Sequence, residues 1–420
     1  MEAAAAQLDV MRTSTLSSLT MVSLIRGALV SLLLGVFATA CAETPSESPA
    51  KRELALGFAV DTTAVPGAWW GVDSARIVLP EIVRTWREYL LVRHIPAQRA
   101  AFWTAADRAR ALDPDPLPTS ESYLLDGRPL LIEALPLVAG DASRWVLRTV
   151  YVGGGTADHP GLLGMERTYI VRETGTDGKA RWALASPVPF ETAGWTRASV
   201  GRIDYVVHPS LSFARARATA TAAWTDSLTN RFSVPATGQI TYFQVPDLQT
   251  GNRVIGLEWV LSGDRAGGRA SPVARIVLAA NPRYAEAYKH ELVHVLLHPL
   301  LGGRSAFVSE GVSYWLGGAR GLSFIELMRD LGSYLEGQPT LTLASILAED
   351  EGGPATSAQF PAAAAIFELA HRRSGDQLVR RLIDTLGSGS PTVADVARAL
   401  DTTASELESD WRTLVTSYAR

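Results

Sequence analysis

The stretch YKHELVHVLLHPLLGGRSAFVSEGVSYWL, residues 288–316, carries three of the seven histidines of the 420-residue chain within nine positions. It contains the pattern His-Glu-Leu-Val-His at 290–294, where apolar residues recur with helical spacing. Histidines four residues apart on a helix lie on one face, so both imidazoles can reach a single ion. A glutamate beside the first histidine can take a proton from metal-bound water. The stretch therefore predicts a metal site with His290 and His294 as ligands and Glu291 as general base.

A catalytic zinc needs a third protein ligand and one open position. His298 continues the spacing, but it lies roughly 12 Å along the helix from His290, too far for ligand bonds of about 2 Å. Glu310 is the better candidate, because it follows the turn at 299–303 that folds the chain back past the first helix. Apolar and aromatic residues surround it, and burying a carboxylate there without a partner is costly. We expect one zinc ion per chain, although this ligand set also tolerates other divalent ions.

Residues 199–420 are predicted to form one domain with a small β-sheet lobe followed by a helical lobe. Runs rich in β-branched and aromatic residues predict strands at 201–210, 238–247 and 271–281. From Asn281-Pro282 onward the pattern is helical, and since Asn is a good N-cap and Pro a good first residue, the helix with the two histidines is expected to start there. A capping box from Thr403 to Glu406 is expected to open the last helix.

Residues 54–198 have a mixed pattern and are predicted to form an N-terminal α+β domain. Helical spacing is found at 77–94 and 97–112. Strands are expected at 144–152, 167–174 and 180–188, with the GTDG sequence at 175–178 as a hairpin turn. Helices followed by a curved antiparallel sheet resemble an NTF2-like cone fold. The predicted fold class of the whole chain is therefore α+β, with two domains.

The first 41 residues resemble a bacterial export signal. Residues 27–40 are an uncharged apolar run, short for a membrane span and typical of a signal-peptide core. Ala38 to Cys41 resembles a lipobox, in which the cysteine is lipidated and becomes the mature N-terminus. We therefore expect an exported protein, anchored to the bacterial cell envelope by a lipid on Cys41. The polar segment 42–53 would then be a linker between the anchor and the folded body.

Two alternatives to the lipid anchor stay open. Ala38 stands where a lipobox usually has leucine, and Ala38-Thr39-Ala40 also fits ordinary signal cleavage, which would give a secreted or periplasmic soluble protein. An uncleaved anchor is the other alternative. In each case the protein is exported.

Composition excludes other classes. The net charge of −4 is spread along the chain without a basic patch, so nucleic acid is not an expected partner. Cys41 is the one cysteine, so an intrachain disulfide cannot form.

HELVH at 290–294 followed by SEG at 309–311 resembles the gluzincin branch of zinc metallopeptidases, the peptidase MA-like group, over roughly residues 200–420. In that family the two histidines and the downstream glutamate bind zinc, and the glutamate of the motif is the general base. The resemblance implies these roles for His290, His294, Glu310 and Glu291, with a peptide or protein as substrate. It also implies that the strand ending in ARIVLAA (274–280) is the edge strand that pairs with an extended substrate.

Two departures from the family matter. Aminopeptidases of this group carry a glycine-rich motif ending in Glu-Asn, for which the chain offers only IGLEWV at 255–260, so aminopeptidase specificity is not inferred. Relatives also have an oxyanion-stabilising tyrosine at the start of a later helix, where this chain has Phe360, which cannot donate a hydrogen bond. The residues that could replace it are Tyr284, Tyr288, Tyr314 and His208.

Besides an active zinc metallopeptidase, the sequence leaves two readings open. One is a zinc-binding envelope protein that is catalytically weak or inactive and serves as a binding or assembly module. The other is a structural or ligand-binding lipoprotein in which the HExxH pattern is incidental.

Overall fold

The computed structural model describes most of the chain from residue 73 onward. The described residues are 73–110, 114–115, 117, 124, 126–138, 141–156, 159–175, 177–235, 238–260, 267–281, 283–348 and 356–419. The predictions of a signal, a lipidated Cys41 and a linker at 42–53 therefore lie outside them. The chain divides into two compact units, Met1–Gly57 and Phe58–Arg420, so both predicted domains fall mainly in the second. Among the described helices, none combines the length and the hydropathy needed to cross a bilayer.

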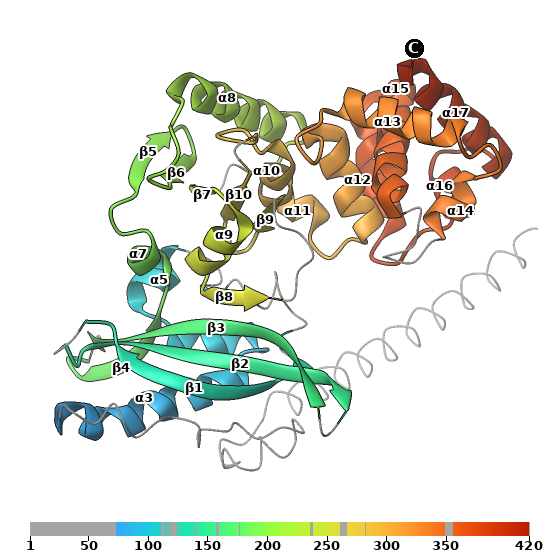
Figure 1. The fold of residues 1–420 in the computed structure, drawn as a ribbon. Coiled ribbons are helices and arrows are strands. Elements are labelled where there is room, and N and C mark those ends of the chain that lie inside the picture. Colours follow the sequence, from blue (N-terminus) through green and yellow to red (C-terminus); the bar gives the residue numbers. More distant parts are fainter. Residues whose placement is uncertain are drawn as a thin grey trace, which may run out of the picture. The chain divides into compact units, whose positions relative to one another are not determined.

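The N-terminal half is an antiparallel sheet with a long helix against one face (Figure 1). The strands β1 (Arg128–Pro136), β2 (Arg144–Thr156), β3 (His159–Thr174) and β4 (Ala180–Ala185) lie in that order, and β8 (Leu257–Val260) also pairs with β3. Helix α3 (Asp73–Val92) buries Trp86 and Tyr89 against sheet residues such as Trp145 and Ile170. The helix expected at 77–94, the three expected strands and the hairpin between β3 and β4 are therefore confirmed.

The prediction of one continuous helix at 97–112 is wrong. The chain forms α4 (Pro96–Arg99), a 3-10 turn η2 (Ala100–Phe102) and α5 (Ala105–Arg110). Trp103 is extended and bridges to Leu184 of β4, and the next amide, that of Thr104, donates to the Leu184 carbonyl at 2.8 Å. Pairing with the sheet thus outcompetes the helical spacing of the sequence.

A second sheet is buried on both faces. Its order is β5 (Thr196–Val200), β6 (Ile203–Val207), β7 (Ile240–Gln244), β10 (Ile276–Ala280) and β9 (Gly267–Ser271), with β6, β7 and β10 parallel. Because successive side chains alternate between faces, Tyr242 enters the core shared with the helical lobe, while Phe243 enters the opposite core. Helices α8 (Arg215–Arg231) and α9 (Leu248–Val254) connect the strands, and the short α7 (Val188–Glu191) precedes them.

The expected edge strand is wrong. The segment ARIVLAA contributes β10, which lies inside the sheet between β7 and β9. The single strand expected at 271–281 is in fact a turn followed by β10: Pro272 lacks an amide hydrogen, Arg275 has a φ of 55°, and its amide donates to the Pro272 carbonyl. The edge strand is β9, at 267–271, for which no strand was predicted.

From residue 289 the chain is helical, which confirms the coarse α+β prediction. The helices are α10 (Lys289–Leu296), α11 (His298–Leu301), α12 (Ala306–Gly317), α13 (Phe324–Glu336), α14 (Leu343–Leu347), α15 (Thr356–Leu386), α16 (Val393–Ala399) and α17 (Ala404–Ala419). The long α15 is kinked at Ser374–Gly375. The capping box that opens α17 is confirmed, since the Thr403 amide donates to Glu406 and the Glu406 amide to Thr403.

The start of α10 differs from the expectation. The helix begins at Lys289, with Tyr288 as its N-cap, eight residues after Asn281. Residues 283–287 instead form a turned segment whose carbonyls accept hydrogen bonds from buried tyrosines of the sheet: Tyr205 bonds to Glu286 and Tyr242 to Ala285. These side-chain bonds give the backbone an alternative to a helical turn.

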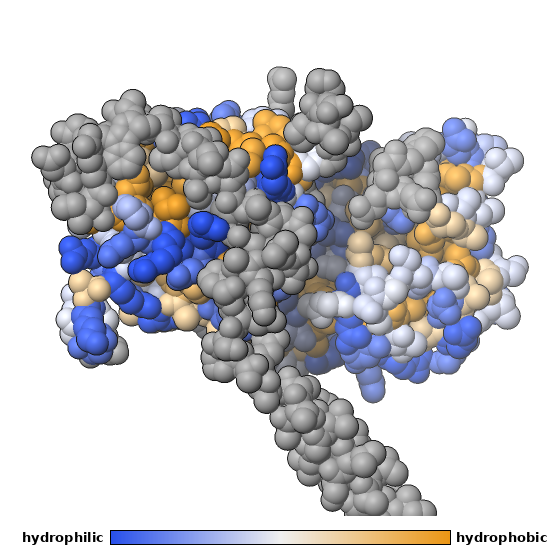
Figure 2. All heavy atoms as spheres, turned by 90° about the horizontal axis from the view of Figure 1, so that it is seen from below, coloured by the Kyte–Doolittle hydropathy of each residue, from blue (hydrophilic) through white to orange (hydrophobic). Residues whose placement is uncertain are grey.

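The surface shown in Figure 2 mixes hydrophilic and hydrophobic side chains where grey atoms leave it visible. Among the described residues, the exposed large apolar side chains are Val138, Leu162, Trp259 and Ile325. Val138 follows β1, Leu162 and Trp259 lie on the paired strands β3 and β8, and Ile325 is in α13.

A glycine sets the distance between α12 and α15. A Cβ atom at Gly311 would lie 2.8 Å from Cε2 of Phe367 and 2.9 Å from Cβ of Ala363. Both contacts are shorter than carbon atoms tolerate, so a larger residue would push the helices apart. Because Gly311 follows Glu310, its packing also positions that carboxylate.

Overpacking in Gly311→Ala should lower the free energy of unfolding by about 1–3 kcal/mol. The higher helix propensity of alanine offsets up to about 1 kcal/mol of this loss. Gly389→Ala is the matched control, because a Cβ there meets nothing within 4 Å. Denaturant unfolding of both variants measures the difference. Equal stability of the two would contradict the close packing of α12 on α15.

Candidate metal centre

The side chains of His290, His294 and Glu310 converge on one point. Nε2 of His290 lies 3.2 Å from Oε2 of Glu310, and Nε2 of His294 lies 3.4 Å from Oε1. The two Nε2 atoms are 3.2 Å apart. Within the described part of the chain, this is the group of three or more His, Cys, Asp or Glu residues arranged so that they could hold a metal ion. The structure thus brings together the three residues that the sequence predicted as ligands.

The spacing of these atoms fits a tetrahedral ion. Ligand atoms at about 2.0–2.2 Å from a tetrahedral zinc lie about 3.3–3.6 Å from one another, and the observed separations are 3.2–3.4 Å. Two imidazole lone pairs and a carboxylate are all hydrogen-bond acceptors, so a shared cation satisfies them together. The donor set of two nitrogens and one oxygen suits zinc.

The other imidazole nitrogens are held by hydrogen bonds. Nδ1 of His290 lies 2.8 Å from the carbonyl of Gly318, which can only accept, so the proton is on Nδ1 and the Nε2 lone pair faces the shared point. Nδ1 of His294 lies 3.3 Å from the Ser309 hydroxyl and 3.4 Å from that of Ser313. Both serines belong to α12, the helix of Glu310. One helix therefore supplies a ligand and orients a second.

The charges of the cluster stabilise one another. Burial alone would raise the pKa of Glu310, but the imidazoles, which can donate from Nε2 when they are protonated there, hold that pKa well below its usual range. Burial alone would lower the pKa of His290, and the interactions with Glu310 and Glu291 raise it above its ordinary value. The arrangement therefore favours ionised Glu310 next to a positive charge.

Glu291 is buried beside the cluster, 7% exposed, in the first turn of α10. Burial raises the pKa of Tyr288, and the charge of Glu291 together with a hydrogen bond to it raises that pKa further. Arg269 of β9 also interacts electrostatically with Glu291. The predicted general base thus faces a tyrosine hydroxyl and a cation from the edge strand.

Of the four residues that could stabilise an oxyanion in place of Phe360, the three tyrosines lie near His290 and the histidine does not. The Tyr314 ring packs edge-on against His290 at 5.2 Å, and Tyr288 lies 6.1 Å from His290 and 3.7 Å from Tyr284, with which it stacks. Phe360 lies 5.7 Å beyond Tyr314. His208 is elsewhere, hydrogen-bonded to Ser210 and packed on Trp195.

Two further sequence segments lie away from the cluster. His298 begins α11, after α10 has ended, and partial burial lowers its pKa. It is not among the converging residues, as the spacing argument required. Residues 257–260 of IGLEWV form β8, in the N-terminal sheet rather than on the edge strand beside α10.

The sequence reasoning missed the glycines that shape the site. A Cβ at Gly268 of β9 would lie 1.8 Å from Cε1 of Tyr288, and a Cβ at Gly317 would lie 2.5 Å from the His290 amide nitrogen. Gly318 has a φ of 70°, and a Cβ there would lie 2.1 Å from the Leu322 carbonyl oxygen. The pairs Gly267-Gly268 and Gly317-Gly318 are the signal that the sequence offered for these close approaches.

Another cluster of buried charges lies in the N-terminal half and is internally satisfied. Arg93 donates to Asp115 at 2.8 Å and to both carboxylate oxygens of Glu166 at 2.8 Å. The hydroxyls of Tyr89 and Tyr151 complete it by donating to Asp115 and Glu166. Burial would raise the pKa of Asp115, but Arg93 keeps it below its usual value. With each charge paired, this cluster stabilises the fold and offers no free ligand.

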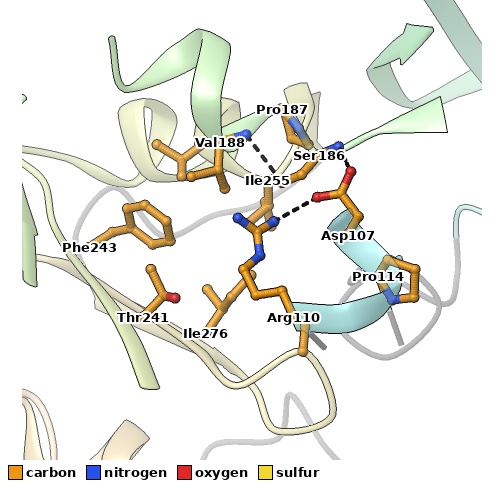
Figure 3. A pocket seen from close by; sticks show the side chains of 12 residues that line it. Asp107, Arg110, Pro114, Ser186, Pro187, Val188, Thr241, Phe243, Ile255 and Ile276 are labelled. Atoms are coloured by element: carbon orange, nitrogen blue, oxygen red, sulfur yellow. Dashed lines mark hydrogen bonds and ion pairs between the residues drawn. The ribbon is translucent and has the colours of Figure 1, made fainter. Parts of the chain in front are cut away.

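A small cavity also lies away from the converging histidines (Figure 3). It is lined by Asp107 and Arg110 of α5, by Val188 of α7, and by Phe243 and Ile276 of the second sheet. Its volume of 30 Å³ is that of about one water. Arg110 points across it to Asp107 at 3.0 Å, so the cation there is already paired.

Comparison with known proteins gives a weak likeness. No protein-family model matches the sequence, and no curated protein matches it. Similar solved structures include an M1 zinc metallopeptidase from Deinococcus radiodurans, with 12% identity, a TM-score of 0.31, and coverage of 70% of this chain and 64% of that one. A variant of the Deinococcus radiodurans enzyme has 10% identity and a TM-score of 0.30, and the match covers 70% of this chain and 64% of that one. A two-domain M1 zinc metallopeptidase variant bound to L-tryptophan also has 10% identity and a TM-score of 0.30, with coverage of 70% of this chain and 63% of that one.

The chain therefore spans slightly less than two thirds of the length of these metallopeptidases. A likeness at this level assigns neither a fold family nor an activity, and both have to be argued from the site itself.

Gly318→Ala should weaken zinc binding about 10–100-fold, because the added methyl displaces the carbonyl that orients His290. Gly303→Ala is the control: its φ of 75° is equally unfavourable for alanine, but a Cβ there meets nothing within 4 Å. Competition with a chromophoric chelator measures the affinity of each variant. The role of Gly318 would be disproved by equal zinc affinities.

Proposed function

We propose that the protein is an exported zinc metallopeptidase that hydrolyses peptide bonds with Glu291 as general base. The observation that carries the proposal is the convergence of His290, His294 and Glu310 at tetrahedral spacing, with Glu291 buried beside them. Two neutral imidazoles and one carboxylate leave a tetrahedral ion with one open position, as a catalytic site requires. The same residues carry the resemblance to gluzincins, to which we assign residues 199–420.

A zinc ion held there would act as a Lewis acid, polarising the scissile carbonyl and lowering the pKa of a coordinated water towards about 7. Glu291 would take the proton of the attacking water and pass it to the leaving amine. Glu291 is 7% exposed, and its charge acts on His290. Tyr288, hydrogen-bonded to Glu291, would fix the orientation of this base.

We assign stabilisation of the developing oxyanion to Tyr314. It lies four residues after Glu310 on α12, so both side chains are on one face of the helix. Its ring contacts His290, and Phe360 backs it from the other side. A hydroxyl in that place takes over the role for which Phe360 lacks a donor.

The edge strand β9 is suited to bind an extended substrate. Among the described strands it is the outermost one of the second sheet next to β10, and it lies against α10, with Gly268 packed on Tyr288. An extended peptide could add to the outer side of this strand through backbone hydrogen bonds. We infer in addition an NTF2-like fold for residues 54–198, as a recruiting module, a spacer or an inhibitory partner of the catalytic half.

The central test is a pair of variants of the full chain. Glu310→Ala should lose most of the roughly one zinc per chain measured by metal analysis, because a ligand is gone. Glu291→Gln should keep the zinc but lose cleavage of a peptide library by about 10³-fold or more, because glutamine cannot accept the proton. Circular dichroism of both variants controls for folding. A folded wild-type chain without stoichiometric zinc would exclude the proposal.

A second candidate function is a zinc-binding envelope module without appreciable catalysis, favoured by Phe360 in place of a donor. It predicts that Glu291→Gln leaves the cellular role intact. Complementation of a deletion strain with this variant separates the two functions: failure to complement favours the peptidase, and full complementation favours the module.

The proposed lipid anchor is tested at its cysteine. Cys41→Ala should move the protein from the membrane fraction to the soluble fraction, because the acyl chains that would hold it are absent. Ala42→Ser serves as the control, since it changes the neighbouring residue and keeps the thiol. If both variants stay in the soluble fraction like the wild type, ordinary secretion replaces the anchor.

A further inference from the structure

A basic pocket adjoins the metal centre at the start of α10. It has a volume of 390 Å³ and lies between α8, the turned segment at 283–287 with the start of α10, and the loop at 317–323. Three cations line it, one from each of α8, the turned segment and α10: Arg217, Arg283 and Lys289. The net charge of the whole chain is −4, so this concentration of positive charge departs from the rest of the molecule.

The pocket has little negative charge to balance these cations. The Glu286 carboxylate, which lies 3.8 Å from Arg217, is 1% exposed and accepts the Ala214 amide at 2.6 Å, and the Glu291 carboxylate lies behind the Tyr288 wall. Within the described part of the chain, Arg283 and Lys289 have no carboxylate at ion-pair distance; Lys289 lies over the Trp224 ring at 5.2 Å. The carboxylate of Glu326 faces Arg283 from α13 but is held in the capping box with Ser323.

The position of Lys289 adds to the argument. It is the first residue of α10, at the positive end of the helix dipole, where a cation is unfavourable. Arg320 lies in the adjoining loop and interacts electrostatically with Tyr284. An anion in the pocket would offset the repulsion among these positive groups.

The pocket shares a wall with the catalytic centre. The stacked rings of Tyr284 and Tyr288 line it, and the Tyr288 hydroxyl is hydrogen-bonded to Glu291. The loop that closes it contains Gly318, whose carbonyl accepts the Nδ1 proton of His290. A peptide that lies across Glu291 can therefore reach the pocket, and an anionic group of that peptide can bind there.

We propose that this pocket binds a carboxylate of the peptide substrate and so gives the enzyme a preference for acidic substrates. The inference rests on the proposed peptidase function, because the wall shared with Glu291 makes the ligand a substrate. The carboxylate comes either from an Asp or Glu side chain or from the C-terminus, and the pocket chemistry is the same for both. Arg283 and Lys289 supply the binding charge, and the two tyrosines exclude water from one side.

The test measures binding without turnover, using the full-length chain with Glu291→Gln. Three random decapeptide mixtures lacking basic residues serve as probes: one without acidic residues and amidated at the C-terminus, one with a free C-terminal carboxylate, and one amidated with a single Glu. Microscale thermophoresis should show about ten-fold tighter binding of one carboxylate mixture than of the neutral one, as two partly exposed ion pairs give. Which mixture gains identifies the source of the carboxylate.

The double substitution Arg283→Gln and Lys289→Gln should abolish this advantage while leaving binding of the neutral mixture unchanged. Lys179→Gln with Arg398→Gln is the matched control, because it removes two exposed cations from the hairpin after β3 and from α16. The advantage should also shrink at high salt, since charges near the surface are screened. Equal binding of all three mixtures, or an advantage that survives the double substitution, overturns the proposal.

A cleavage assay of the neutral mixture with the wild-type chain distinguishes failure of the pocket proposal from failure of the peptidase proposal. Cleavage without any carboxylate preference overturns the basic pocket alone. Carboxylate binding without any cleavage overturns the peptidase and with it the assignment of the bound peptide as substrate.

Discussion

The close approach of α12 to α10 is the constraint on which the metal centre depends. The two helices can come this near because glycine stands at the contact: a side chain at Gly317 would overlap the backbone of His290. On its other side α12 is held against α15 by Gly311. The helix is thus fixed from both sides, and this packing holds the Glu310 carboxylate within 3.2–3.4 Å of both imidazoles. Side chains held in this way by packing keep their mutual geometry.

The sheet contributes to the same site through its tyrosines. Hydroxyls of Tyr205 and Tyr242 bind the backbone of the turned segment before α10, and the amide of Tyr288 donates to Tyr242 at 2.9 Å. These bonds shorten the helix at its start and place Tyr284 and Tyr288 beside the site.

Much of this could be predicted from the sequence, and the reasons for the failures are physical. His290, Glu291 and His294 lie within one helical turn, so their relation follows from local geometry alone. Glu310 could be placed because a short turn separates two predicted helices. The edge strand could not be predicted, because the β9 sequence Gly-Gly-Arg-Ala-Ser has no strand propensity. Its strand conformation depends on pairing with β10. The start of α10 could not be predicted either, since it depends on hydrogen bonds to Tyr242, which lies more than 40 residues earlier in the sequence. The N-terminal strands were recognised from their own pattern, but β1 and β8 were not.

The pairing of β8 with β3 joins the two halves of the chain by more than a covalent linker. Glu258 of β8 receives two hydrogen bonds from Arg148 of β2, at 2.7 and 2.8 Å, and Arg148 also reaches Glu133 of β1. The chain thus leaves the first sheet, builds most of the second and returns to the first before it reaches the helices that carry His290, His294 and Glu310. The segment between β7 and β9 is therefore coupled to the first sheet by strand pairing and by an ionic network as well as by the chain itself.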